Sequence, residues 1–162
     1  MLQILLAELE RSAVEADSKD AKSKPDKVTV VARRILPTLR HYSSWLLTIS
    51  PLLVECKEKD TPLSVQIAEF WKIYANTLTL LALTFEVVDL PDVDYLLEED
   101  EETLGFAPLD QEATSRRYMD AGHRRKPRMH DEGVERSHPN IEMLYRIREF
   151  VIDGLDLVVG NV

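Results

Sequence analysis

The sequence predicts an all-α fold, and three observations support this class. Apolar residues recur at spacings of three and four along four segments, as they do on one face of a helix. No hairpin signature joins a pair of alternating strands, and no motif repeats with a period of 20–50 residues. Because the chain has 162 residues, 44% of them hydrophobic, we expect a single helical domain over residues 1–162 with a real core.

The first apolar segment predicts a helix over residues 1–16. The residues on its apolar side are Leu2, Leu5, Leu6, Leu9 and Ala13. Residues 17–27 that follow are mainly Ser, Lys and Asp with one proline. This composition is typical of a flexible loop.

The second segment predicts a helix from about residue 28 to residue 49. Its apolar stripe is formed by Val28, Val31, Ile35, Leu39, Tyr42, Leu46 and Ile49. Pro37 lies within this stripe, and a proline removes one helical hydrogen bond and clashes one turn back. We therefore expect a kink or a break near Arg33. Ser50 and Pro51 predict a separate short turn that runs through Val54.

The third segment predicts the central helix of the domain, over residues 63–85. Its stripe is formed by Leu63, Ile67, Phe70, Tyr74, Leu78, Leu81 and Phe85. Residues 78–85 are apolar almost all round, which is typical of a helix buried between neighbours.

The fourth segment predicts a C-terminal helix within residues 137–160, with its regular part over 140–159. The residues expected to point inward are Ile141, Leu144, Ile147, Val151, Leu155 and Val158. Glu142 and Arg146 have the four-residue spacing of an ion pair, which we expect on the outer side. Gly154, inside this helix, indicates close packing against a neighbour.

A long charged loop, residues 86–136, separates the third helix from the fourth. Residues 86–112 hold eleven acids and no base, whereas residues 116–128 hold six bases and one acid, Asp120. A loop of this length is usually functional or disordered. The acidic run 92–102 predicts a solvated surface, with docking to a basic partner as the alternative. Tyr95-Leu96-Leu97 within it resembles a motif that anchors on a partner or on this domain.

An apolar segment, Gly105-Phe106-Ala107-Pro108-Leu109, follows the acidic run directly. Such a segment needs a surface to dock on, so we expect Phe106 and Leu109 to hold the connector against the third helix. The residues of this predicted clip are Phe70, Trp71, Asn76, Gly105, Phe106, Pro108 and Leu109. Asn76 would bond to the backbone of residues 105–109 if it is buried; the alternative is an exposed amide. We expect Trp71 in the core.

The basic part of the loop is the candidate nucleic-acid site. Its cations are Arg116, Arg117, Arg124, Arg125, Lys126 and Arg128. They would neutralise phosphates of RNA or single-stranded DNA without reading sequence, with Tyr118 and His123 available to stack on bases. The alternative is a solvated loop that pairs with the acidic run before it, and the net charge of −9 repels polyanions at long range.

Nothing in the sequence predicts an enzyme, a cofactor or a metal site. No nucleophile lies in a recognisable arrangement with a base. The histidines and acids His123, His130, Asp131, Glu135 and His138 match no ligand spacing, and Cys56 is the single cysteine. No apolar run approaches the roughly 20 residues that cross a bilayer, so we expect no membrane contact. The single cysteine favours a reducing, intracellular location, nuclear or cytoplasmic.

Phe70-Trp71, Ala75-Asn76-x-Leu78 and Glu102-x-Leu104-Gly105-Phe106-x-Pro108-Leu109 together resemble a known family. It is the helical DNA/RNA-binding domain, of the telomere-elongation type, of the SMG nonsense-mediated mRNA decay factors and their telomerase-regulator relatives. The resemblance covers about residues 28–158, with its firm motifs in residues 66–109.

The resemblance implies an α-α superhelix of antiparallel helical hairpins, with residues 28–85 as the hairpin core. It also implies a scaffold that assembles proteins of mRNA surveillance or of telomerase complexes. In the family this region follows a phosphopeptide-binding bundle, and some members add a nuclease domain. We expect neither in this chain, which has the character of a truncated piece. The expected function is therefore non-enzymatic protein assembly; the alternative is a nucleic-acid-binding module that uses residues 116–128.

Overall fold

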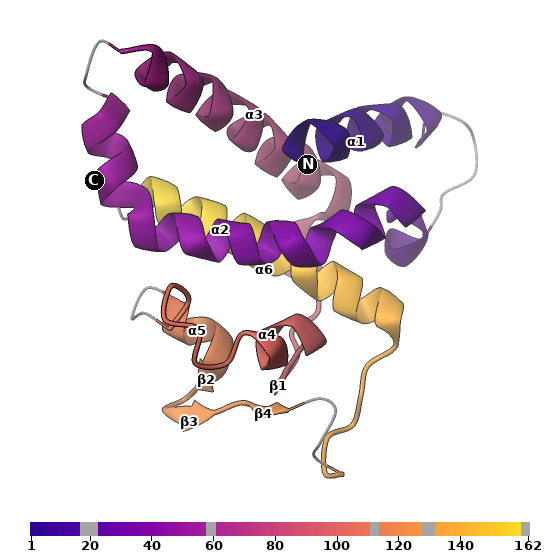
Figure 1. The fold of residues 1–162 in the computed structure, drawn as a ribbon. Helices are drawn as coiled ribbons and strands as arrows, with labels where there is room; N and C mark the ends of the chain where they lie inside the picture. The colour runs from indigo at the N-terminus through magenta and orange to yellow at the C-terminus, as the bar shows by residue number, and fades with distance from the viewer. Residues whose placement is uncertain (17–22, 58–60, 111–113, 128–131, 160–162) are drawn as a thin grey trace.

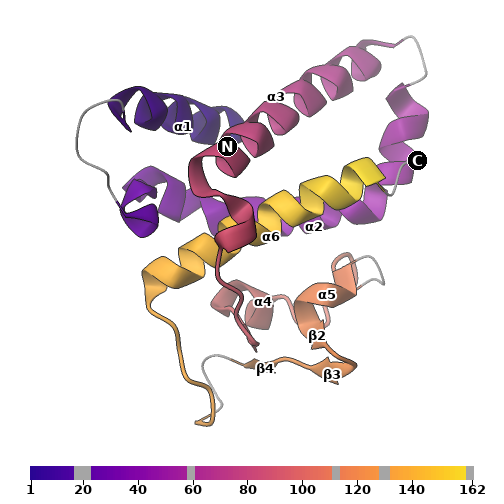
Figure 2. The same ribbon diagram turned by 180° about the vertical axis from the view of Figure 1, so that it is seen from behind.

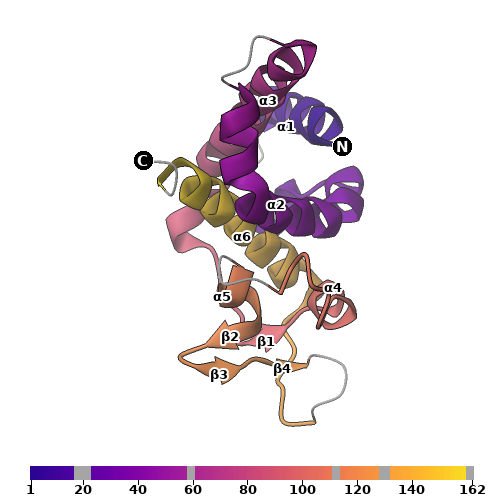
Figure 3. The ribbon, with the colours of Figure 1, turned by 60° about the vertical axis from the view of Figure 1, so that its left-hand side comes forward.

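The protein is mostly α-helical and arranged in three layers, as a computed structural model shows for residues 1–16, 23–57, 61–110, 114–127 and 132–159 (Figure 1). Helices α1 (Leu2–Ala16) and α3 (Pro62–Phe85) form one layer. The middle layer contains α2 (Val30–Lys57) and α6 (Pro139–Val159). Short elements that follow α3 in the chain form the third layer, on the far side of α2 and α6 from α3 (Figures 1 and 3). The predicted all-α class is confirmed.

The elements of the third layer are short helices and two-residue strands. They are β1 (Tyr95–Leu96), α4 (Glu98–Glu102), α5 (Ser115–Tyr118), β2 (Met119–Asp120), β3 (His123–Arg124) and β4 (Lys126–Pro127). The turn η2 (Val87–Asp89) follows α3, contacts α3 and α6, and leads into this layer. β1 pairs with β4 in parallel, and β2 pairs with β3 as an antiparallel hairpin. Ala121 and Gly122 close that hairpin with positive φ angles of 46° and 83°, as a tight two-residue turn requires. The sequence analysis did not predict this hairpin.

Helix α2 is longer than predicted because it continues through both of its prolines to Lys57. Of the kink or break expected near Arg33, the break is therefore wrong, and so is the separate turn after Pro51. Pro51 cannot donate to the carbonyl of Leu47, one turn back. The Ser50 hydroxyl donates to that carbonyl instead, at 3.1 Å, so the proline leaves no unsatisfied acceptor there. A short η1 turn (Lys24–Lys27) precedes α2.

Helix α3 begins where its sequence has a strong start signal. Thr61 and Ser64 form a reciprocal capping box, and Pro62 occupies the first turn. The buried positions are Ile67, Tyr74, Thr77, Leu81 and Phe85. Leu63 and Leu83 are exposed instead, at 53% and 75%, because α1 and α6 cover only one side of the helix. The prediction that residues 78–85 are buried all round is wrong.

Helix α6 packs tightly on α3 through Gly154. A Cβ atom at this position would lie 2.2 Å from Leu78 Cδ1, which fits the predicted close approach. Leu155 and Val158 are exposed, although they were predicted to point inward. Glu142 and Arg146 are buried rather than outside. The charged face of α6 lies inside because the third layer covers it (Figure 2).

One apolar core lies among α1, α2, α3 and α6, with an aromatic cluster at its centre. Tyr74 contacts Phe70, Trp71 and Phe150 with ring centroids 5.4–5.8 Å apart, the spacing that favours aromatic pairs. A second, smaller cluster of Val93, Tyr95, Leu97 and Tyr145 holds the third layer to α6.

Candidate binding surfaces

A buried ion-pair cluster joins the acidic run to the middle layer. Arg40 of α2 donates two hydrogen bonds to Asp100 of α4, Nη1–Oδ1 at 2.7 Å and Nη2–Oδ2 at 2.9 Å. Glu99 accepts from Arg146 of α6 at 2.7 Å on each oxygen. Both pairs are bidentate, the strong geometry for arginine and carboxylate. The sequence analysis predicted that the acidic run is a solvated surface. That prediction is wrong for Glu99 and Asp100, which form internal ion pairs.

The charges of this cluster change the acidity of its carboxyl groups. Burial alone would raise the pKa of Asp100, but the charge of Arg40 and hydrogen bonds from His41 and Arg40 hold that pKa far below its ordinary value. Burial is likewise outweighed at Glu99, whose pKa is lowered by Arg146 and Arg40. Both groups are carboxylates in the folded protein at neutral pH.

A second buried cluster ties the basic segment to α6. Arg116 donates to Glu149 at 2.8 and 2.9 Å and to Asp153 at 2.5 Å. Arg117 donates to the other oxygen of Asp153 at 2.6 Å and to the backbone carbonyl of Arg40 at 2.8 Å. The basic segment thus pairs with acids of α6, whereas Glu99 and Asp100 of the acidic run pair with arginines of α2 and α6. The alternative that the two halves of the loop pair with each other is wrong for these residues.

These pairs divide the predicted nucleic-acid residues into two groups. Arg117 is buried and Arg116 is neutralised, so neither presents a charge to a ligand. Arg125 is half-buried and donates to the backbone carbonyl of Val93. Arg124 and Lys126 are exposed on β3 and β4. Arg128 lies outside the described residues.

The predicted clip does not dock on α3. Phe106 is 54% exposed, while Leu109 is only 5% exposed, so Leu109 alone is an anchor. Gly105 turns the chain with φ 74°, and the amides of Leu109 and Asp110 donate back to the Phe106 carbonyl at 2.8 and 3.0 Å. The ring of Phe106 is exposed at this tight turn. The turn follows α4 in the third layer, and the middle layer lies between the third layer and α3 (Figure 1).

The α3 residues of the predicted clip have other roles. Phe70 and Trp71 are half-buried and pack against the main core, as expected for Trp71. Asn76 is exposed, so the prediction that it bonds to residues 105–109 is wrong and its alternative holds. Gly105 and Pro108 are also exposed.

Tyr95, in the motif within the acidic run, anchors on this domain. Its hydroxyl donates to Glu142 Oε1 at 2.9 Å and accepts from the Ser137 amide at 3.0 Å. Leu96 and Leu97 are also buried. Of the two interpretations, the internal anchor is the correct one for these residues.

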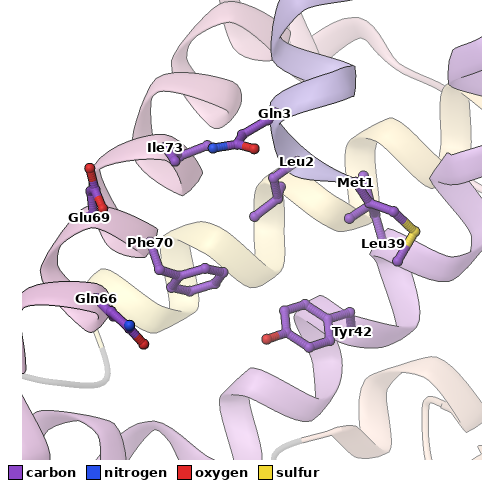
Figure 4. A pocket seen from close by; sticks show the side chains of 9 residues that line it. All are labelled: Met1, Leu2, Gln3, Leu39, Tyr42, Gln66, Glu69, Phe70 and Ile73. Carbon is purple, nitrogen blue, oxygen red and sulfur yellow. The ribbon is translucent and has the colours of Figure 1, made fainter. Parts of the chain in front are cut away.

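A pocket of about 390 Å³ opens among α1, α2 and α3. Its lining is formed by Met1, Leu2, Gln3, Leu39, Tyr42, Gln66, Glu69, Phe70 and Ile73. Tyr42 and Phe70 project into the same space from facing helices (Figure 4), with ring centroids 6.2 Å apart. Glu69 is the one charged side chain in this lining, so the pocket is suited to an apolar group with a basic neighbour.

A second pocket of about 370 Å³ lies in the third layer, between the turn after α4 and the β2–β3 hairpin. Its lining is formed by Leu104, Gly105, Asp110, Ser115, Tyr118, Met119 and Arg124. Asp110 and Arg124 give it one charge of each sign. We call these cavities the helical pocket and the hairpin pocket.

The sequence analysis missed the residues that organise both charge clusters. Arg40 lies next to Leu39 of the apolar stripe of the second helix, and Glu149 and Asp153 recur four residues apart on the last helix. Charges at such positions are a usable signal of internal ion pairs. Over the residues that the structure describes, no group of three His, Cys, Asp or Glu is placed to hold a metal, and none of their helices has the length and apolarity to cross a membrane.

No curated protein and no solved structure matches the chain. The family model of the Est1 DNA/RNA binding domain matches residues 1–113, which is more than two thirds of the chain. The match includes the motifs of residues 66–109 on which the predicted resemblance rested, and that prediction is confirmed. The match ends before α5 and α6, so it covers less of the C-terminal part than expected. This chain belongs to the family of the Est1 DNA/RNA binding domain.

Proposed function

We propose that this protein is a non-enzymatic assembly module that works inside the cell, in the nucleus or the cytoplasm. Its partners would be other proteins of telomerase complexes or of mRNA surveillance. The observation that carries the proposal is the helical pocket, an open cavity into which the exposed Tyr42 and the half-buried Phe70 project above the buried Leu39. An open apolar pocket of this size is typical of a site that receives a side chain of a partner.

The chemistry of the helical pocket restricts the partner segment. Leu39 is a buried floor residue, whereas Gln66 and Glu69 are exposed at the rim. The partner would insert an apolar or aromatic side chain and place a lysine or arginine beside Glu69. The net charge of −9 favours such basic partners during the encounter.

Two lysine substitutions on the same helix test this proposal. Ile73 lines the helical pocket, and Leu83 is exposed outside it. The tagged full chain should recover telomerase or mRNA-surveillance proteins from its native cells. Ile73→Lys should abolish that recovery, and Leu83→Lys should not. Equal recovery by both variants, or recovery of neither class of protein by the parent chain, would contradict the proposal.

A second candidate function is direct contact with RNA or single-stranded DNA, and the family description favours it. The residues that could serve are fewer than the sequence analysis proposed. Arg124 and Lys126 are exposed, while Arg116, Arg117 and Arg125 already serve internal contacts. Binding would therefore involve few phosphates.

Fluorescence anisotropy at two salt concentrations tests this second function. Arg124→Glu should weaken the binding of a single strand, and Lys72→Glu, an exposed charge reversal on α3, should change it little. Absence of binding by the parent chain at low salt would remove this candidate.

A further inference from the structure

We propose that the hairpin pocket receives one unpaired nucleobase that carries an exocyclic amino group, and that Arg124 contacts the adjacent phosphate. The proposal rests on the second candidate function, nucleic-acid contact, and assigns it a site and a base preference. Its occupant is a single strand, since a base held in a duplex cannot enter a pocket.

The pocket has the size and the walls that a planar ligand needs. Its volume of about 370 Å³ lies within the usual range for small-ligand sites. Leu104 and Met119 supply apolar walls, and Tyr118, which is 7% exposed, also lines the pocket. A planar base can pack against these apolar side chains, and such packing does not depend on the net charge of the protein.

Local hydrogen bonds hold the walls of the pocket in place. The Tyr118 hydroxyl lies 3.2 Å from Thr103 Oγ1. The Arg125 amide donates to the Tyr118 carbonyl at 2.9 Å. Met119 pairs with Arg124 across the hairpin, so an apolar wall and the cation are fixed relative to each other. A site formed in advance loses little entropy when its ligand binds.

The two charged groups of the pocket suit two different parts of a nucleotide. Arg124 is exposed, and its guanidinium has no ion pair with any residue of the described ranges, so it can bind a phosphate. The Asp110 carboxylate only accepts hydrogen bonds. It therefore favours the amino group of cytosine and disfavours uracil, which has a carbonyl oxygen at the same position.

Two homopolymers whose bases differ at that position, and in the protonation of the adjacent ring nitrogen, test the proposal on the full chain. The ligands are labelled oligo-C and oligo-U of equal length, measured by anisotropy. We expect the parent chain to bind oligo-C at least fivefold more tightly than oligo-U, since one good base contact gives a preference of this order. Asp110→Asn should remove most of the preference, because an amide can face either base.

Arg124→Glu should weaken the binding of both oligomers about tenfold. The salt dependence of binding should fall by the equivalent of about one phosphate contact. Asp110 and Arg124 are exposed, so both variants should keep the parent melting temperature. Lys72→Glu is the matched control and should bind as the parent does.

Several results would overturn the proposal, and they differ in what they leave standing. Equal binding of oligo-C and oligo-U by the parent chain would reject the base preference. If neither Arg124→Glu nor Asp110→Asn changed the affinity for the oligomers, nucleic acid would bind elsewhere on the protein, and the second function would stand. No binding at low salt would remove that function too. If Arg124→Glu abolished recovery of a protein partner while no oligomer bound, the pocket would be a protein site.

Discussion

Arg40 and Asp100 form a bidentate ion pair across 60 residues of sequence, and both side chains are almost completely buried. The pair connects the centre of α2 to the N-terminal end of α4, where Asp100 also accepts from the Leu97 amide at 3.1 Å. It therefore fixes the third layer against the middle layer and caps a short helix with the same carboxylate.

Removal of this carboxylate should be among the most damaging single changes in the chain. Asp100→Asn removes the bidentate carboxylate of the buried Arg40 and leaves it only the longer pair with Glu99, at 3.3 Å; breaking a buried ion pair typically costs about 3–5 kcal/mol. Urea unfolding should show this loss. Glu98→Gln, at an exposed position of the same helix, is the control and should change the free energy of unfolding by less than about 0.5 kcal/mol. Similar stability for the two variants would show that Arg40 is solvated.

The lowered pKa values predict a loss of stability in acid. A carboxyl group whose pKa is lower in the folded than in the unfolded chain stabilises the fold above the unfolded value, and this contribution disappears as the pH falls towards the folded value. Asp100 and Glu99 both have lowered pKa values. The free energy of unfolding should therefore fall as the pH drops below about 4. Asp100→Asn should flatten that decline, and a parent curve that stays level down to pH 2 would contradict the assignment.

Two alanine substitutions in one turn should differ sharply in how much they lower the stability of the fold. Leu109 is 5% exposed and Phe106 is 54% exposed. Leu109→Ala should lower stability by about 2–4 kcal/mol, because it leaves a cavity, and Phe106→Ala by less than about 1 kcal/mol. Thermal melts of the two variants provide the measurement. The opposite order would mean that the aromatic ring, not the leucine, holds the turn.

Enlargement of Gly154 should disturb the contact between α6 and α3. Gly154→Val would press on Leu78, whose Cδ1 lies 2.2 Å from the site of an added Cβ, and such overpacking costs about 1–3 kcal/mol. The double variant Gly154→Val with Leu78→Ala should recover part of the loss, because the shorter side chain makes room. Additive losses in chemical denaturation would show that the two residues do not contact each other.

The long helices could be predicted because their signal is local. The stripe of α3 was expected over residues 63–85, and the helix spans Pro62–Phe85. Apolar residues at spacings of three and four identify a helix without any information about the elements that pack against it. The same locality explains the errors at Leu83 and Leu155, because a stripe shows which side of a helix is apolar but not how much of that side a neighbour covers.

The charged connector could not be predicted in the same way. Glu99 and Asp100 look like any solvated acids until Arg40 and Arg146, from two distant helices, are brought against them. Burial of a charge depends on a partner that is remote in sequence. The hairpin pocket has the same origin, since Leu104 and Met119 share a wall only after the third layer has formed.

The position of α6 between the other two layers has a consequence for how the chain matures. It contacts α2 and α3 on one side and carries the carboxylates that hold Arg116 and Arg117 on the other. Of the elements described, it is the last to leave the ribosome. The nascent protein must therefore keep two uncovered surfaces, one apolar and one positively charged, until α6 has been synthesised, and during that interval it should depend on chaperones.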